Sequence, residues 1–248
     1  MGKVDEYIEK LKHLKDWEAY LLAESGLPGR RANIELGKAV AQTGNAEQFY
    51  EFLKYDVQEA QTNSPYEFLV FCGVLGLGQL LARGDMGALG RLRSFASDPR
   101  WRVREAVAMA LQHYGQANPG DLLAEMEYWS VGNVWEQRAA AAAVCEPDFL
   151  VQVERISTVF DILDHITKAI ERYQDRLEDG FQVLKKGMGY CWSVAVVAAP
   201  EEGKTRFERW FASRDPDVRW VLKENLKKKR MLKMDTEWVE KWRIMIEV

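Results

Sequence analysis

Apolar residues along this chain of 248 residues recur mainly at intervals of three and four. Val159, Leu163, Ile166 and Ile170 show this spacing most regularly. Residues so spaced fall on one side of an α-helix. No stretch alternates apolar and polar residues between hairpin turns, which is the pattern of a half-buried strand. The pattern therefore predicts an all-α chain.

The breaks in this pattern divide the chain into many short helices. Ser64-Pro65 with Glu67 and Asn133 with Glu136 have the residue types of helix-starting capping boxes. Short loops make successive helices antiparallel neighbours. The predicted helices cover about 3–23, 34–43, 46–56, 64–84, 86–96, 99–117, 119–130, 134–144, 159–177, 181–199, 201–213, 215–229 and 235–247.

One short phrase occurs three times, each time after a helix that bears an aromatic residue. Its sharpest copy is Asp215-Pro216-Asp217-Val218-Arg219, and looser copies run from Asp98 to Arg104 and from Gly132 to Arg138. Arg104 and Arg138 lie 34 residues apart, and Arg138 and Arg219 lie 81 apart. These intervals fit one and two copies of a unit of roughly 40 residues, the period of helical-hairpin repeats.

At these residues the chain resembles HEAT repeats, in which Asp-Pro-x-Val-Arg opens the second helix of each hairpin. The resemblance is clearest over 86–146 and 200–230. It implies a single HEAT-like domain over 1–248, an armadillo-like α-α superhelix of about six hairpins. It also implies that the second helices line a concave groove and that the repeat Asp and Arg bond within and between repeats.

A second resemblance concerns one repeat only. Trp129-Ser130, Trp135 and Arg138, followed by five alanines, look like a repeat of the DNA-alkylation-repair glycosylases, which are HEAT-like solenoids of similar length. In those proteins tryptophans and an aspartate line the cleft that holds the damaged nucleotide. This chain has no Trp-Asp dipeptide, so the resemblance assigns no catalytic carboxylate.

The overall composition limits the classes of partner. The chain is 47% hydrophobic and 29% charged, with a net charge of −4, which argues against a general nucleic-acid coat but allows a local basic face. Cys72, Cys145 and Cys191 are far apart, which indicates free thiols in a reducing compartment. No secretory segment opens the sequence, and the apolar run Trp192 to Pro200 is too short to span a bilayer. We therefore expect a cytoplasmic protein with no membrane partner.

The strongest functional signal is a basic segment near the C-terminus. Residues 214–233 hold eight basic and three acidic side chains, a net charge of +5. Helical spacing puts four of the basic residues in one stripe beside Trp220: Arg219, Lys223, Lys227 and Arg230. Arg104 belongs to a second basic group, around Trp101. The residues predicted to line a partner-binding groove are Arg100, Trp101, Arg102, Trp135, Arg138, Trp220, Lys223, Lys227 and Arg230.

Each of these features also has a purely structural interpretation. Lysines near a helix C-terminus are favoured by the helix dipole, and tryptophans at repeat turns supply core area. No other motif indicates catalysis, a metal or a cofactor: Gly203-Lys204-Thr205 lacks a preceding strand and the three histidines are isolated. The sequence thus predicts a non-catalytic binding or scaffold protein with a protein or nucleic-acid partner. The alternative is an alkylation-repair-type DNA-binding protein, active or degenerate.

Overall fold

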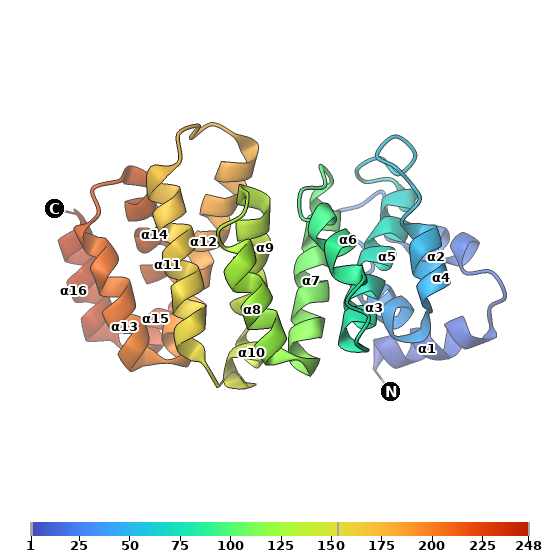
Figure 1. Cartoon of the computed structure of the whole chain (residues 1–248), viewed down its shortest axis with the longest axis horizontal. Coiled ribbons are helices and arrows are strands. Elements are labelled where there is room, and N and C mark those ends of the chain that lie inside the picture. The colour runs from blue at the N-terminus through green and yellow to red at the C-terminus, as the bar shows by residue number, and fades with distance from the viewer. Residues whose placement is uncertain (1, 153, 248) are drawn as a thin grey trace. The chain divides into compact units, whose positions relative to one another are not determined.

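The computed structural model describes residues 2–152 and 154–247, and every regular element among them is helical. The all-α prediction is therefore confirmed for the described part of the chain. Contacts group the chain into two compact units, residues 1–117 (unit 1) and 118–248 (unit 2) (Figure 1).

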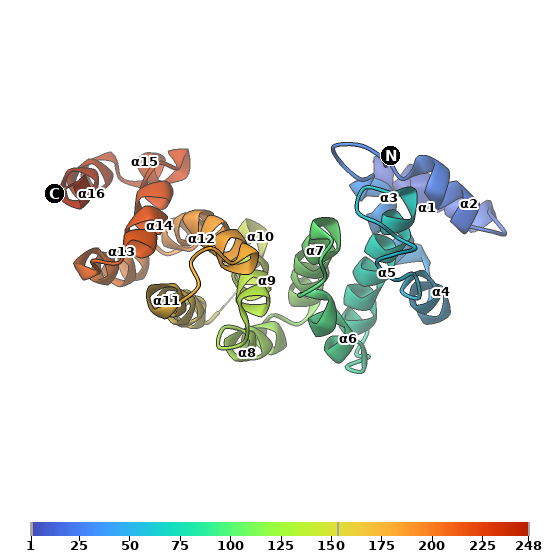
Figure 2. The same cartoon turned by 90° about the horizontal axis from the view of Figure 1, so that it is seen from above.

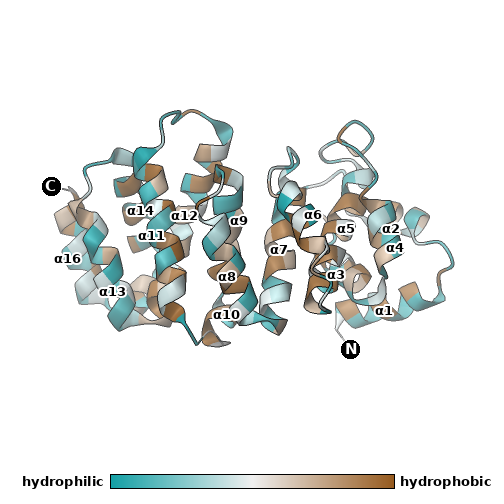
Figure 3. Ribbon diagram, in the orientation of Figure 1, coloured by the Kyte–Doolittle hydropathy of each residue, from teal (hydrophilic) through white to brown (hydrophobic). Residues whose placement is uncertain are grey.

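Unit 1 is built around one long apolar helix, α5. Its helices are α1 (Lys3–His13), α2 (Glu18–Glu24), α3 (Ile34–Thr43), α4 (Ala46–Phe52), α5 (Pro65–Ala82), α6 (Ala88–Phe95) and α7 (Trp101–Ala117). All but α1 pack directly against α5. Alone among the described helices, α5 has the length and apolar composition to cross a membrane, but 78% of it is buried inside the protein (Figure 3). It is the core helix of this unit.

Glycines let other helices come close to α5. A methyl group at Gly76 would lie 2.2 Å from the Phe49 ring, and one at Gly78 would lie 2.6 Å from the Ala110 backbone. The second contact fixes where α5 crosses α7. Since α5 also touches α3, the three helices lie side by side and present one common face.

Unit 2 arranges its helices in two layers, as Figure 2 shows. One layer holds α8, α11 and α13, and the other holds α9, α12 and α14, with α12 packed against both of its neighbours. The bounds are α8 (Pro119–Trp129), α9 (Val134–Val144), α10 (Pro147–Gln152), α11 (Ile156–Arg172), α12 (Asp179–Ala198), α13 (Pro200–Arg209), the 3-10 turn η1 (Trp210–Ala212), α14 (Pro216–Leu226), α15 (Lys229–Met234) and α16 (Thr236–Glu247).

Local cap chemistry predicted several helix starts correctly. Asn133 and Glu136 form the expected capping box at α9, the Ser64 side chain caps α5, and Asp215 caps α14. The predicted helix over 3–23 is wrong, because the chain breaks between α1 and α2. Trp17 lies in that break, and its indole N–H donates to the Leu11 carbonyl at 3.0 Å.

Other element predictions also differ from the structure: the helix expected over 215–229 ends at Leu226, and neither α10 nor α15 was predicted. The helix expected over 46–56 ends at Phe52, and the one expected to continue to 177 ends at Arg172. Asp179 begins α12 instead of ending the preceding helix. Glu67 closes no capping box with Ser64, because its carboxylate accepts from the Asn63 N–H at 2.7 Å and from Arg102 at 3.1 Å.

Candidate binding surfaces

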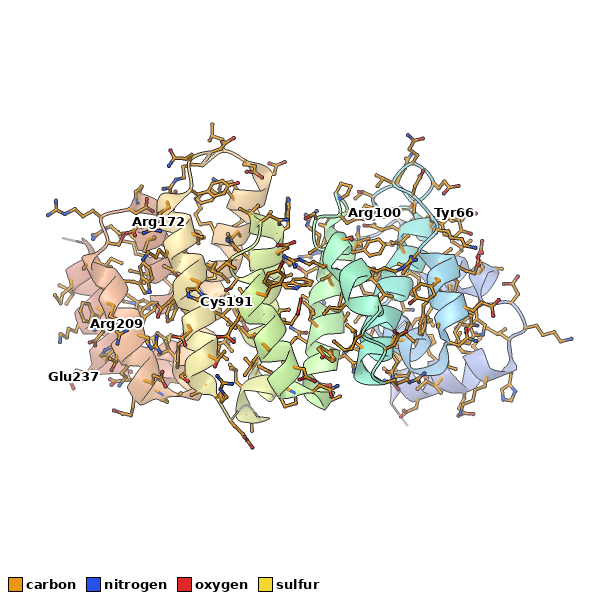
Figure 4. The ribbon with its side chains drawn as sticks, in the orientation of Figure 1. Tyr66, Arg100, Arg172, Cys191, Arg209 and Glu237 are labelled. Atoms are coloured by element: carbon orange, nitrogen blue, oxygen red, sulfur yellow. The ribbon has the colours of Figure 1, made fainter. Side chains whose placement is uncertain are left out.

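The predicted site residue Arg100 lies in the interior of unit 1, only 2% exposed. Its Nε and Nη2 donate to the two Asp98 carboxylate oxygens at 2.9 and 2.7 Å, and Nη1 donates to the Ala60 carbonyl at 3.1 Å. Figure 4 places it at the same end of the unit as Tyr66. A guanidinium so enclosed ties the turn before α7 to the loop after α4, and it is not presented to a partner.

Arg102 is also buried, at 5% exposure, and it joins three separate segments. Its Nη1 donates to Glu67 at 3.1 Å, and its Nη2 donates to the Gly29 carbonyl at 2.7 Å and to Asn63 Oδ1 at 3.2 Å. Asn63 Oδ1 also accepts from the Gly29 N–H at 3.0 Å. Two buried atoms of this network, Arg102 Nε and Glu67 Oε1, have no hydrogen-bond partner among the described residues.

Beside Arg102, the common face of α3, α5 and α7 is hollowed into a pocket of about 510 Å³, which we call the Trp101 pocket. The Trp101 ring is 45% exposed and lies 4.4 Å from the Arg102 guanidinium carbon. The pocket lining is mostly apolar but includes three charged residues. The full set is Arg31, Ala32, Ile34, Phe71, Trp101, Arg102, Glu105 and Met109. Glu105 was not predicted, although it lies four residues after Trp101 and so on the same helix face.

A smaller hollow of about 230 Å³ lies on the same face and shares Met109 with the Trp101 pocket. Its polar lining is mostly amide side chains, and His113 Nε2 lies 2.8 Å from Gln79 Oε1. Burial and the nearby Arg83 lower the pKa of His113, so its neutral form is favoured.

In unit 2 the predicted residues gather around α12. A methyl group at Gly180 would lie 3.1 Å from Trp135 Cε2, and one at Gly187 would lie 4.0 Å from Arg138 Cγ, so α9 borders one side of α12. On the other side, a methyl group at Gly189 would lie 3.0 Å from Trp220 Cζ3 on α14.

Basic and aromatic side chains mix on this part of unit 2. The Arg230 guanidinium carbon lies 4.5 Å from the ring centre of Tyr190, which is 43% exposed, and Lys185 Nζ lies 5.3 Å from that of Trp220. Lys223 follows Trp220 by three residues on α14, and Lys227, at the C-cap of that helix, follows it by seven, so they share its face. We call this the α12 surface and define it as Trp135, Arg138, Lys185, Lys186, Tyr190, Trp220, Lys223, Lys227, Lys228 and Arg230.

Two acids belong to the same neighbourhood. Glu224 pairs with Lys227 at 2.6 Å, and Asp217 pairs with Lys185 at 2.9 Å and with Arg176 at 2.8 Å. Burial opposes ionisation of Asp217, but hydrogen bonds from Lys185 and Arg176 outweigh it and lower its pKa. The α12 surface therefore keeps an excess of positive charge. Lys185, Lys186 and Tyr190 were not predicted, because α12 reads as a buried apolar helix.

The Asp215–Arg219 copy of the repeat phrase forms hydrogen bonds and an ion pair within the protein. Asp215 accepts from the N–H groups of Asp217 and Val218 at 3.0 Å each, and it also pairs with Arg176 at 2.9 Å. Arg219 donates to the Ile246 carbonyl, which turns it towards α16 and away from the predicted stripe. Arg104 likewise donates to the Pro99 carbonyl at 2.9 Å.

Comparison with family models, with curated proteins and with solved structures finds no match to this chain. Among the described residues, no three His, Cys, Asp or Glu side chains gather in a way that could hold a metal ion. The candidate sites are therefore the two surfaces described above, the Trp101 pocket of unit 1 and the α12 surface of unit 2.

Proposed function

We propose that this protein is a non-catalytic, HEAT-like helical binding protein whose α12 surface binds nucleic acid through its phosphate backbone. The observation that carries the proposal is the alignment of basic and aromatic side chains along α12 and α14. Phosphates attract such a surface by charge, and bases stack on exposed aromatic rings. Arg230 beside the exposed ring of Tyr190 provides both kinds of contact within a few ångströms, and Lys185, which is paired with Asp217, lies beside the half-buried ring of Trp220.

The distribution of acids supports the same assignment. Asp161 and Asp164 on α11 pair with Arg206 of α13 at 2.8 and 3.0 Å, and Glu208 accepts from the Trp238 indole at 2.7 Å. These acids belong to the layer opposite α12, so unit 2 can carry a basic face although the chain is acidic overall. Local charge of this kind steers a polyanion to one face.

The test is a fluorescence-anisotropy titration of labelled single-stranded and duplex DNA with the full chain, repeated over a range of salt. For each phosphate contact removed by K186E or K223E, we expect the log–log salt slope to fall in magnitude by about 0.9 on duplex DNA. Y190A should weaken single-strand binding about tenfold by loss of stacking.

K168E is the matched control, since Lys168 is an exposed lysine on α11, in the other layer. It should bind DNA as the unmodified protein does. Equal binding of K186E and K168E would sink the proposal. Binding of polyglutamate as tight as that of DNA would assign the surface to an acidic protein partner.

One observation favours the alkylation-repair alternative: Glu105 and Arg31 line the same pocket as the exposed Trp101. That reaction needs a carboxylate beside a stacked base and a base taken out of the duplex. The corresponding test measures release of methylated bases from alkylated duplex DNA. The alternative requires release by the unmodified protein and loss of release in E105Q.

A further inference from the structure

The Trp101 pocket in unit 1 has the features of a small-molecule site, and it lies outside the α12 surface. Its volume of about 510 Å³ falls within the range of 300–1,000 Å³ that is usual for ligand pockets. Such sites combine a mostly apolar lining with a few placed polar groups. Phe71 of α5, Ile34 of α3 and Met109 of α7 supply the apolar part.

The pocket favours a flat aromatic ligand. Trp101 is large, 45% exposed and set between apolar neighbours, so a planar ring that covered it would bury apolar area on both molecules. The Arg102 guanidinium carbon lies 4.4 Å from the Trp101 ring centre. This contact helps to fix the position of the indole ring.

The polar groups favour a hydrogen-bond acceptor on that ligand. Arg102 lines the pocket, is nine-tenths buried, and keeps Nε without a partner among the described residues. A buried N–H group in that condition is costly. Since Nε has almost no accessible surface, an acceptor on a ligand would remove the cost by displacing the side chain that covers it.

The charges around the pocket balance. Arg102 is neutralised by Glu67 at 3.1 Å, and the remaining charged residues of the lining, Arg31 and Glu105, have opposite signs. A ligand with a net charge would gain little from such a site. We therefore propose that the Trp101 pocket binds an uncharged, planar heteroaromatic molecule with a carbonyl-type acceptor, the acceptor directed to Arg102 and a neighbouring N–H group directed to Glu105.

The experiment uses the full chain and ligand-observed NMR titrations with quinolin-2-one, a planar lactam that has both polar groups. A ligand of this size should bind in about the millimolar range or tighter. Quinoline-2-carboxylate tests the effect of charge, and cyclohexanecarboxamide tests the need for an aromatic ring. We expect quinolin-2-one to bind at least about tenfold more tightly than either.

Variants then locate the site. W101A removes an exposed side chain and should keep the helical circular dichroism while weakening the lactam about tenfold or more. W135A, which removes a tryptophan of unit 2, should leave affinity unchanged. R102K keeps the pair with Glu67 and removes the Nε donor, so it should lower the preference for the lactam over unsubstituted naphthalene. If R102K does not fold, W101A and the ligand series still test whether the Trp101 pocket binds the lactam.

Three binding results would each overturn the proposal. They are absence of quinolin-2-one binding at millimolar concentration, equal binding by W101A and the unmodified protein, and tighter binding of the carboxylate than of the lactam. Release of a methylated base that stops in E105Q would also overturn it, because the pocket would then belong to DNA chemistry. None of these results depends on whether the α12 surface binds nucleic acid.

Discussion

Arg100 and Arg102 show how neighbouring charged residues come to be buried. Each guanidinium meets a carboxylate and a backbone carbonyl from a distant loop: Asp98 and Ala60 for Arg100, Glu67 and Gly29 for Arg102. A buried charge is tolerated only when it is paired and hydrogen-bonded in this way. The planar fork of arginine donates to several acceptors at once, which a lysine cannot do.

We expect R100A to lower the free energy of unfolding by about 3 kcal/mol, because it leaves the Asp98 carboxylate buried without its partner. Urea denaturation followed by circular dichroism measures this change. R31A, at an exposed arginine, is the control and should change stability by less than about 0.5 kcal/mol. The double variant D98A/R100A should cost less than the two single changes together, since neither charge is left alone.

His113 gives unit 1 a dependence on pH in the range where histidine titrates. Burial and Arg83 lower its pKa from the usual 6.5, so the unfolded chain binds more protons than the folded one on the acidic side of that value. The stabilisation is complete above pH 6.5 and is lost as the pH falls through the folded-state pKa. H113Q keeps a hydrogen-bonding group and should remove this part of the acid sensitivity of the urea midpoint. An equal pH slope in H113Q and the unmodified protein would contradict the assignment.

The sequence predicted which residues are basic or aromatic, but not which of them are exposed. Arg100 and Arg102 lie in the repeat phrase, and apart from Asp98, which pairs with Arg100, the groups that enclose them come from residues 29–67. Trp129, expected among the tryptophans at the repeat turns, is fully buried and bonded to Glu125. Trp101 remains exposed. Exposure depends on contacts between distant segments, which periodicity does not contain.

At the scale of elements, one buried side chain fastens α14 to α12. Asn225 is fully buried; its Oδ1 accepts from the Ser193 N–H at 2.8 Å, and its Nδ2 donates to the carbonyls of Met188 and Val221, both at 2.8 Å. Two of these bonds cross between the helices. They fix α14 in the register that brings Trp220 against Gly189.

We expect N225L to destabilise the protein by about 2–4 kcal/mol, because it removes all three hydrogen bonds of a fully buried side-chain amide. E224A changes the neighbouring, partly exposed residue, which pairs with an exposed lysine, and should cost less than about 1 kcal/mol. Thermal unfolding followed by circular dichroism compares the two. A similar shift of the unfolding temperature in the two variants would mean that the Asn225 hydrogen bonds do not fix the packing of α14 on α12.

Several helix starts were predictable from a side chain that caps the backbone within a few residues, as at Asn133, Ser64 and Asp215. The start of α10 was not, although Glu146 accepts from the Phe149 N–H there at 3.0 Å. The break between α1 and α2 was not, since it depends on Trp17 folding back to Leu11. The function of the repeat phrase was predictable in part: the expected internal bonding of Asp215 and Arg219 is observed. The α12 surface was predictable only in its α9, α14 and α15 parts, because Lys186 and Tyr190 of α12 lie in an otherwise apolar run.

At the scale of the whole chain, charge and core are organised within each unit. Unit 2 holds the basic segment that gave the strongest functional signal, and the structure adds lysines of α12 to it. Unit 1 has its own core helix and its own pocket. The sequence predicted one domain over residues 1–248, and that boundary remains a prediction beside the two compact units found from contacts.

If each unit has an independent core, a cavity in one should leave the other protected. L81A removes a fully buried side chain of α5 and should cost unit 1 about 3 kcal/mol. Amides of 3–117 that exchange by opening of the whole unit should then exchange about a hundredfold faster, while those of 118–247 change little. L163A, in the core of unit 2, should show the reverse pattern. Peptide-resolved hydrogen exchange measures both variants. Equal acceleration in both units from either change would show that the chain unfolds as one cooperative body, as expected of a continuous repeat array with strong coupling between neighbours.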